Sequence, residues 1–330
     1  MSENIVSIKG LGVHYPIVGG WFGEKKIVKA VDNINIDIKR GQFFGLVGES
    51  GSGKTTLGRA ILQAAPISKG EITFNDGERK FDVKSLKNQD LLDFRRRAQL
   101  IFQDPYAALS PRMTVRDIIA EPLEVMKLTE NKEETNQRVR DIASECRLNI
   151  EHLRRFPHAF SGGQRQRISI ARALVANPDF LVADESVAAL DVSIQADILN
   201  LLKSLQKEHG LTFLFISHDL SVVAHVCDVV AVMYLGQIVE MAPNKALFRK
   251  PRHPYTAALL SAIPSLDPDA ESQAIKLEGE IPSPLSPPSG CRFHTRCPHA
   301  KPRCSEEAPE WRQIDEEHFV SCHFADELNL

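Results

Sequence analysis

Residues 48–55 read Gly-Glu-Ser-Gly-Ser-Gly-Lys-Thr and follow a short apolar run at 43–47. Two glycines separated by four residues and followed by Lys and Thr are the pattern of a phosphate-binding loop. Glycines let the backbone wrap so closely that successive N–H groups point at phosphate oxygens, and the positive end of a following helix adds to the attraction. The spacing therefore predicts a nucleoside triphosphate site, with a flexible Gly/Ser linker as the competing interpretation.

The residue types in this loop indicate how the nucleotide is bound. Lys54 is expected to reach the β- and γ-phosphates, and the Thr55 hydroxyl is expected to ligate Mg²⁺. The residues predicted to hold the phosphates are Gly48, Ser50, Gly51, Gly53, Lys54, Thr55 and Thr56.

Two carboxylates, Asp184 and Glu185, directly follow the apolar run 180–183. An all-apolar run of this length is typical of a strand buried on both faces of a parallel sheet. Asp184 is then placed to hold Mg²⁺, and Glu185 to orient or deprotonate an attacking water. The alternative is a solvated pair of acids at the end of a strand.

Ser161-Gly162-Gly163-Gln164 precedes a run with helical spacing. A Ser and a pair of glycines at a helix N-terminus bring a hydroxyl and free N–H groups together, which is an anion site. A simple helix cap is the interpretation that the motif alone favours. Its place between the phosphate loop and the Asp-Glu pair favours an anion site.

The elements around these motifs predict an α/β fold. Runs at 180–183, 212–216 and 229–234 read as buried strands that alternate with helices, which favours a parallel, doubly wound core. Residues 5–38 read as antiparallel strands, and 105–177 as mainly helical. The composition becomes proline-rich after residue 248, so a separate element is expected to begin near residue 250.

Composition and charge limit the possible functions. The chain has 330 residues, 43% hydrophobic and 25% charged, and a net charge of −3. This charge argues against a protein that gains its affinity by neutralising nucleic-acid phosphates, so no nucleic-acid partner is expected. The polar N-terminus lacks a secretion signal, and no apolar run approaches the roughly 20 residues that span a bilayer. We therefore expect a cytoplasmic protein that could reach a membrane only by docking.

The order of the motifs resembles that of the ATP-binding subunits of ABC transporters. The matching elements, in family order, are the phosphate loop 48–55, Gln103, Phe160-Ser161-Gly162-Gly163-Gln164, Asp184-Glu185, Ala189-Leu190-Asp191 and His218. The resemblance covers roughly residues 5–250. It implies a P-loop NTPase ABC ATPase domain at residues 1–250, with a parallel-sheet core, an antiparallel β subdomain and a helical subdomain at about 104–172.

The resemblance also implies a head-to-tail dimer that holds two ATP molecules at its interface, each with Mg²⁺. One subunit would supply the phosphate loop, and the other would supply Ser161, Gly162, Gly163 and Gln164 to the γ-phosphate. Asp191 would lie in the loop that touches the opposite site. This loop departs from the family pattern, because Ser186-Val187-Ala188 replaces the usual residues and Ala188 lacks a hydroxyl.

Three further roles follow from the resemblance. Gln103 would sense Mg²⁺ and the attacking water, and its loop would couple hydrolysis to membrane subunits. His218 would contact the γ-phosphate and hold Glu185 in position. Tyr15 is the expected aromatic residue that stacks on adenine, with Trp21, Phe22 or Phe43 as alternatives.

Four cysteines, Cys291, Cys297, Cys304 and Cys322, crowd into the C-terminal part of the chain. In a reducing compartment such a group favours a metal site over disulfides. No pair has the two to four intervening residues typical of zinc, whereas an iron–sulfur cluster tolerates varied spacing. The family resemblance also points to a four-iron cluster in this region, so we expect a 4Fe–4S cluster at these cysteines, with zinc or packed free thiols as alternatives. The isolated Cys146 and Cys227 are expected to be core residues.

The region 251–330 contains Pro251-Arg252-His253-Pro254-Tyr255-Thr256, then Leu277-Glu278-Gly279-Glu280-Ile281-Pro282-Ser283-Pro284, and then the cysteines. With these blocks it resembles the C-terminal region of the dipeptide/oligopeptide branch of ABC importers, which includes nickel and glutathione systems. We therefore expect an ATPase at the cytoplasmic face of the inner membrane that powers peptide import. The partners implied are a second, different ATPase subunit, two membrane permease subunits and an extracytoplasmic solute-binding protein. The other hypotheses are import of another solute of this branch, an iron–sulfur sensor that gates the ATPase, and an ABC-type ATPase acting on nucleic acid or ribosomes.

Overall fold

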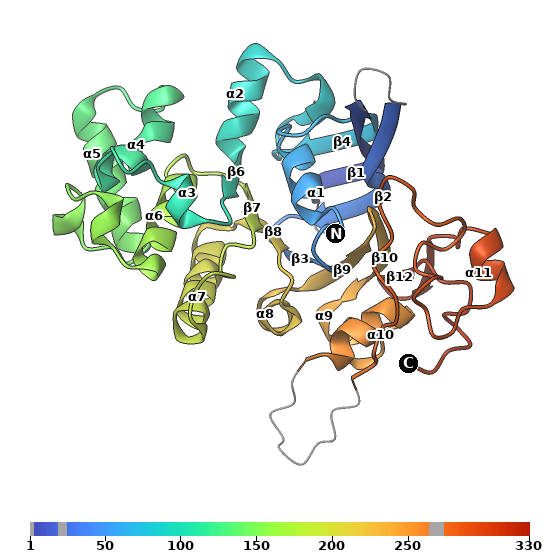
Figure 1. The fold of residues 1–330 in the computed structure, drawn as a ribbon. Helices are drawn as coiled ribbons and strands as arrows, with labels where there is room; N and C mark the ends of the chain where they lie inside the picture. The colour runs from blue at the N-terminus through green and yellow to red at the C-terminus, as the bar shows by residue number, and fades with distance from the viewer. Residues whose placement is uncertain (1–2, 19–24, 264–273) are drawn as a thin grey trace. The chain divides into compact units, whose positions relative to one another are not determined.

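The computed structural model describes residues 3–18, 25–263 and 274–330 (Figure 1). Its strands are β1 (Asn4–Val18), β2 (Lys25–Lys39), β3 (Phe43–Val47), β4 (Lys69–Asn75), β5 (Lys80–Asp82), β6 (Ala98–Ile101), β7 (Phe180–Asp184), β8 (Thr212–Ile216), β9 (Val229–Tyr234), β10 (Gln237–Pro243), β11 (Arg312–Asp315) and β12 (His318–Val320). Its α-helices are α1 (Lys54–Ile61), α2 (Asn88–Arg97), α3 (Pro105–Ala108), α4 (Val115–Val125), α5 (Lys132–Glu145), α6 (Gly162–Leu174), α7 (Val192–His209), α8 (Leu220–Val226), α9 (Asn244–Arg249), α10 (Pro254–Ser261) and α11 (Pro302–Glu306).

The chain divides into two compact units that each contain separate stretches of sequence. The first unit comprises residues 1–6, 37–42 and 73–216, and the second comprises 7–36, 43–72 and 217–330. The phosphate loop therefore shares a unit with the C-terminal residues. The predicted boundary near residue 250 and the predicted helical subdomain limits stay predictions.

In the first unit, β8, β7 and β6 lie side by side and parallel. Every residue of β7 and β8 is buried, because both faces of these strands are covered. The strands predicted at 180–183 and 212–216 and their parallel arrangement are therefore confirmed.

The helical part of the first unit forms where the sequence supplies good helix starts. Thr114 caps α4 by accepting a hydrogen bond from the Asp117 N–H, and Asn131 caps α5 by accepting one from the Glu134 N–H. Helices α4, α5 and α6 are grouped together in Figure 1, and α6 packs against both others. The buried faces of α4 and α5 carry Val115, Ile118, Ile119, Leu123, Val139 and Ile142.

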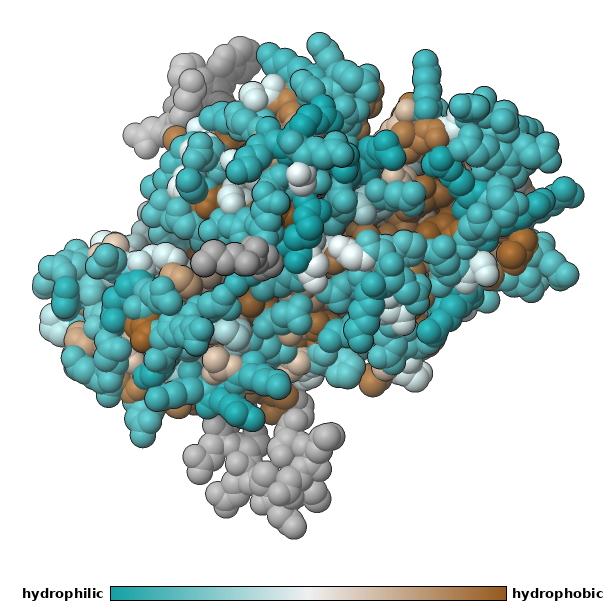
Figure 2. All heavy atoms as spheres, turned by 180° about the vertical axis from the view of Figure 1, so that it is seen from behind, coloured by the Kyte–Doolittle hydropathy of each residue, from teal (hydrophilic) through white to brown (hydrophobic). Residues whose placement is uncertain are grey.

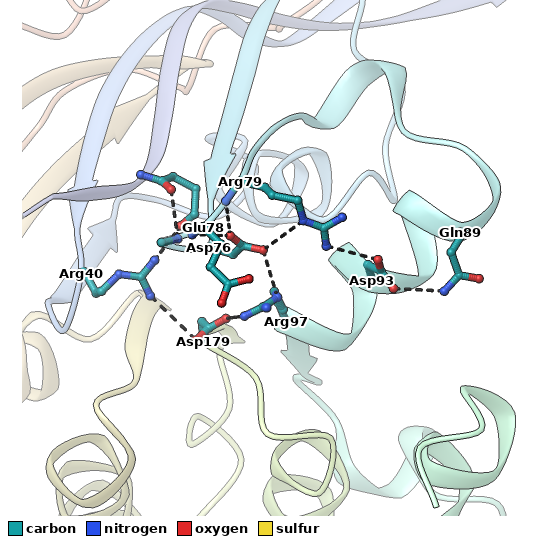
Figure 3. A network of polar contacts seen from close by, with 10 residues as sticks. Arg40, Asp76, Glu78, Arg79, Gln89, Asp93, Arg97 and Asp179 are labelled. Atoms are coloured by element: carbon teal, nitrogen blue, oxygen red, sulfur yellow. Dashed lines mark hydrogen bonds and ion pairs between the residues drawn. The ribbon is translucent and has the colours of Figure 1, made fainter.

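Asp76 is the centre of a charged network in the first unit, shown in Figure 3. Its Oδ1 accepts hydrogen bonds from the backbone N–H groups of Glu78 at 2.9 Å and Arg79 at 2.6 Å. Its Oδ2 lies 3.2 Å from Nε of Arg97, whose Nη1 donates to Asp179 at 2.9 Å. Asp76 is only 7% exposed, so its negative charge is stabilised mainly by these protein groups and not by water.

In the second unit, the strand order is β11-β12-β10-β9-β3. Strands β3 and β9 are parallel, whereas β10 runs antiparallel to both β9 and β12. The strand predicted at 229–234 is confirmed. Strands β11 and β12 of the proline-rich region thus extend the sheet that carries the phosphate loop.

Glu240 on β10 anchors the residues that follow position 250. Its side chain is fully buried and accepts hydrogen bonds from the backbone N–H groups of Arg252 at 2.7 Å and His253 at 3.0 Å. His318 Nε2 lies 2.7 Å from the same carboxylate. Since a buried carboxylate needs such partners, these contacts tie the C-terminal residues to β10.

Helix α1 follows the phosphate loop and ends at Ile61, and Gln63 beyond it adopts a left-handed φ of 53°. The surface in Figure 2 is mostly hydrophilic, with apolar residues scattered over it. Among the described residues, no helix combines the length and apolar character needed to cross a membrane.

Asp76→Asn should lower the stability of the protein at pH 7 by about 1–3 kcal/mol, since the substitution removes a buried charge that Arg97 and backbone N–H groups bind. Burial opposes ionisation of Asp76, but the backbone N–H groups and the two arginines outweigh it, so the pKa lies below its usual value of 3.8. The stabilisation is therefore complete above pH 3.8 and is lost as the pH falls through the lowered pKa.

Urea unfolding of the wild type and the variant between pH 7 and pH 3 measures this effect. The difference in unfolding free energy should shrink at the acidic end. A difference that does not change with pH would exclude the charge of Asp76 as its source.

Candidate functional site

The phosphate loop follows β3, whose residues are all buried. Gly48 has a φ of 149° and Gly53 a φ of 109°, both unfavourable for residues with a side chain. A Cβ on Gly48 would lie 2.1 Å from the Met233 carbonyl oxygen, and one on Gly53 would lie 2.2 Å from the Ala30 carbonyl oxygen. The two glycines at the motif positions are therefore required by close backbone contacts as well as by the turn.

Lys54 and Ser52 show that the loop fits a phosphate ligand. The Lys54 side chain is 4% exposed, and its Nζ donates to the carbonyl oxygens of Gly48 at 2.7 Å and Glu49 at 3.0 Å. It thus lies along the loop. The Ser52 hydroxyl is buried and has no hydrogen-bond partner among the described residues. Helix α1 starts at Lys54 without a side-chain cap, and its N-terminus directly follows the loop, where a helix attracts anions.

The other predicted ATP-binding residues of the second unit are His218 and Tyr15. His218 is exposed and follows Ser217, whose N–H donates to the Leu46 carbonyl of β3 at 3.2 Å. Tyr15 on β1 is 37% exposed and can offer its ring to a ligand. Phe43 is fully buried in β3, which removes it as an alternative, and Trp21 and Phe22 lie outside the described residues.

In the first unit, Glu185 and Gln103 lie together. Gln103 Nε2 donates to Glu185 Oε2 at 2.8 Å, although 82 positions separate them. Glu185 has a left-handed φ of 46°, and its N–H donates to the Ile216 carbonyl at 2.9 Å. Such a backbone conformation is costly for a non-glycine residue and is often found at functional sites. Asp184, at the end of β7, is 6% exposed.

Ser161 begins α6 in a capping box. Its hydroxyl accepts from the Gln164 N–H at 3.4 Å, and its own N–H donates to Gln164 Oε1 at 3.0 Å. The helix N-terminus expected at this motif is confirmed. Gly163 is required by packing, since a Cβ there would lie 2.6 Å from Cγ2 of Ile194 on α7.

Asp191 is the exposed N-cap residue of α7, and its side chain makes no capping hydrogen bond. Ala188 is also exposed, and its N–H donates to the Glu185 carbonyl at 3.1 Å. The loop between Glu185 and Asp191 thus presents small and acidic side chains to solvent.

The predicted iron–sulfur cluster is wrong. In the described part of the chain, no group of three or more Cys, His, Asp or Glu side chains could hold a metal ion. Burial raises the pKa of Cys291 to about 12 and that of Cys297 to about 11, and it also raises the pKa of Cys322. Burial thus disfavours the thiolate form of these side chains.

All six cysteines are free, which leaves packed thiols as the alternative that fits. Cys304 is 8% exposed. Cys146 and Cys227 are core residues, as predicted, with 0% and 5% exposure.

Three residues around the phosphate loop were not predicted. Ser52 occupies a variable position of the loop pattern, so its buried hydroxyl had no sequence signal. Glu49 is bound by Arg296 and Tyr255, which lie more than 200 positions away. Arg296 lies between Cys291 and Cys297 in the sequence, and no local pattern there indicates a contact with the phosphate loop.

Three features define an ATP-binding cassette ATPase. They are the phosphate loop with its required glycines before α1, the capped Ser-Gly-Gly-Gln helix, and the hydrogen-bonded pair of Gln103 and Glu185. Residues 31–188 match the family model described as ABC transporter, and residues 239–304 match the model described as oligopeptide/dipeptide transporter, C-terminal region. The chain belongs to the ABC transporter ATP-binding family and carries this C-terminal region.

Relatives and solved structures agree with this assignment. YkfD of Bacillus subtilis, whose name assigns it provisionally to oligopeptide transport as an ATP-binding protein, is 51% identical over 91% of each chain. AppF of the same organism, an oligopeptide transport ATP-binding protein, is 46% identical over 97% of each chain.

Among solved structures, the dimeric ATP-binding cassette MJ0796 in a post-hydrolysis state bound to ADP and Pi is 28% identical, with a TM-score of 0.63. The match covers 72% of this chain and 98% of that one. CbiO1 of Clostridium perfringens, part of the ABC transporter complex cbiONQ, is 27% identical with a TM-score of 0.62, over 75% and 91% of the two chains.

Gly48→Ala should raise the Kd for ATP about 100-fold or more, since the new Cβ would collide with a backbone carbonyl and force the loop to move. Gly51→Ala is the matched control, because Gly51 also has a positive φ of 77° but faces open space. The backbone strain of Gly51→Ala should raise the Kd for ATP about tenfold or less. Titration with a fluorescent ATP analogue measures both, and equal effects of the two substitutions would exclude the contact with Met233 as the cause.

Proposed function

We propose that this protein is the ATP-hydrolysing subunit of an ABC importer of di- and oligopeptides. The observation that carries this proposal is the match of residues 239–304 to the C-terminal region of oligopeptide/dipeptide transporters. Relatives that are about 50% identical to this chain carry names that refer to oligopeptide transport or peptide import, and these names support the same solute class. Import of a nickel chelate or of glutathione is the second candidate, because both belong to the same branch.

The phosphate loop is proposed to bind the triphosphate of ATP. Gly48, Ser50, Gly51, Gly53 and Thr56 would donate backbone or hydroxyl groups to phosphate oxygens. Lys54 would turn from the loop carbonyls to the β- and γ-phosphates, which present a stronger negative charge. Tyr15 would stack on adenine, and its partial exposure supports this role.

Mg²⁺ is proposed to be held by Thr55, Gln103 and Asp184, all of which offer oxygen ligands. When bound, the ion would neutralise charge on the phosphate oxygens. Glu185 would orient the attacking water and accept its proton. The hydrogen bond from Gln103 supports this role, because it fixes the carboxylate that must meet the water. His218 would contact the γ-phosphate and help to hold Glu185.

Hydrolysis is proposed to need a second ATPase subunit, of a different chain. The Ser161, Gly162, Gly163 and Gln164 helix end of one subunit would close over the ATP of the other. Asp191 would contact the opposite site, and Ala188 would make this contact without the usual hydroxyl. The exposure of Ser161 and Asp191 supports a role at an interface.

The remaining partners are proposed to be two membrane permease subunits and an extracytoplasmic solute-binding protein. Phe102 and Tyr106, which flank Gln103, are 43% and 62% exposed and could contact a permease. Docking there would hold the protein at the cytoplasmic face of the inner membrane. We propose that residues 1–250 form the ATPase domain, with its helical subdomain at about 104–172, and that 251–330 form the C-terminal element.

Glu185→Gln should leave ATP binding intact and reduce kcat at least about 100-fold, because the amide cannot accept the proton of the attacking water. Glu151→Gln is the matched control, since Glu151 is exposed in the same unit and should keep wild-type turnover. Steady-state phosphate release and nucleotide binding measure the two effects. Wild-type turnover of Glu185→Gln would remove this residue from the mechanism.

Co-expression with peptide permease subunits should yield a membrane complex whose ATPase rate rises when a peptide-loaded binding protein is added. Parallel assays with nickel chelates and glutathione identify the solute. Stimulation by either of these and not by peptide would replace the peptide assignment.

A further inference from the structure

The second residue of the phosphate loop, Glu49, is held by side chains from the C-terminal part of the same unit. Arg296 binds its carboxylate with two hydrogen bonds, Nη1 to Oε2 at 2.8 Å and Nη2 to Oε1 at 3.0 Å. The Tyr255 hydroxyl accepts a hydrogen bond from the Glu49 N–H at 2.9 Å. The Glu49 carbonyl accepts one from Lys54. Every polar group of Glu49 therefore has a partner.

The contact between Arg296 and Glu49 is well shielded from water. The Arg296 side chain is 7% exposed and that of Glu49 is 26% exposed. Two parallel hydrogen bonds between a guanidinium and a carboxylate are among the strongest polar contacts in proteins, and poor solvation strengthens them. The hydrogen bonds with Glu49 raise the pKa of Arg296 above its usual range, so the guanidinium stays charged.

Aromatic packing keeps Arg296 in this orientation. Its guanidinium carbon lies 5.9 Å from the centre of the Tyr234 ring. The rings of Tyr234 and Tyr255 lie 4.7 Å apart, and Phe293 packs against them at 5.2 Å and 5.3 Å. Tyr234, Tyr255 and Phe293 are almost completely buried.

A second arginine of the C-terminal region is anchored to residues outside the loop segment 48–55. Arg292 binds Asp32 at 2.5 Å and the Leu235 carbonyl. Arg296 therefore belongs to a segment with its own attachment to the unit, and its contact with Glu49 is an addition to that attachment.

Glu49 also presents an electrostatic problem for nucleotide binding. It places a negative charge inside a loop that must accept the phosphates of ATP, and like charges at this range repel each other. A free carboxylate could also bond to the loop N–H groups that phosphate needs. Arg296 neutralises the charge and holds the carboxylate away from them.

We propose that Arg296 is a positioning residue for ATP binding, through which the C-terminal region sets the nucleotide affinity of the phosphate loop. The arginine neutralises and orients Glu49, and Tyr255 fixes the backbone of the same residue. This role rests on ATP binding at the loop and does not depend on which solute is transported. A change in the C-terminal region that weakens the contact with Glu49 lowers the affinity for ATP.

The test compares four variants of the full chain by ATP binding, with thermal unfolding to confirm the fold. Arg296→Met leaves Glu49 unpaired and should raise the Kd for Mg-ATP about tenfold or more. Because the cause is a charge, the increase should be smaller in high salt. The KM for ATP should rise in parallel, while kcat at saturating ATP should stay within about twofold of the wild-type value.

The double variant Glu49→Gln with Arg296→Met is the decisive measurement. It lacks both charges and should return the Kd to within about threefold of the wild type, whereas a purely structural role of Arg296 predicts no recovery. Glu49→Gln alone should bind ATP as tightly as the wild type or more tightly. Arg303→Met is the matched control, since Arg303 lies in the same C-terminal region and its side chain is 60% exposed.

An unchanged Kd for Arg296→Met would overturn the proposal. A double variant as weak as Arg296→Met alone would overturn it too, and so would a tenfold loss of affinity in Glu49→Gln. If Arg296→Met does not fold, Glu49→Gln and the double variant still decide the question. A failure of peptide to stimulate the ATPase would affect only the transport assignment, because these measurements need neither permease nor peptide.

Discussion

The close approach of the phosphate loop to neighbouring backbone is the constraint on which nucleotide binding depends. At Gly48 and Gly53 a Cβ atom would lie little more than 2 Å from a carbonyl oxygen. The loop can therefore take its path only if these two positions have no side chain. This path aligns the loop with the uncapped start of α1 and lets Lys54 bond to the loop carbonyls. The buried strand β3 and its parallel neighbour β9 hold the loop in place.

The Glu185 carboxylate, which is proposed to activate the attacking water, is held by a comparable constraint in the other unit. Glu185 adopts a left-handed conformation at the end of β7, where the Ile216 carbonyl accepts its N–H. The strain is balanced by the packing of β7 and β8, which are buried along their whole length. Gln103 then meets the carboxylate from a loop that follows β6. Parallel strands thus position the groups that are proposed to act in ATP hydrolysis.

Several elements could be predicted from the sequence because their signals are local. The apolar runs at 212–216 and 229–234 correspond to β8 and β9 without a shift in boundaries. The capped start of α6 was predicted from Ser161 and the helical run after Gln164. The metal site expected at the cysteines was wrong, because spacing along the chain does not report how the thiols are arranged in the fold. Among the described residues no group of three or more Cys, His, Asp or Glu side chains could hold a metal ion, and burial disfavours the thiolate form of Cys291 and Cys297.

By itself the sequence determined the ligand class, the order of the motifs and the family, since glycine spacing and strand-end carboxylates are consequences of local backbone geometry. Only the tertiary structure decided how Glu49 is neutralised. Arg296 lies 247 positions further along the chain, and its contact with Glu49 exists because the C-terminal strands extend the sheet that carries the phosphate loop. Charge pairing over such a separation depends on the folded path of the chain, which no local pattern of residues encodes.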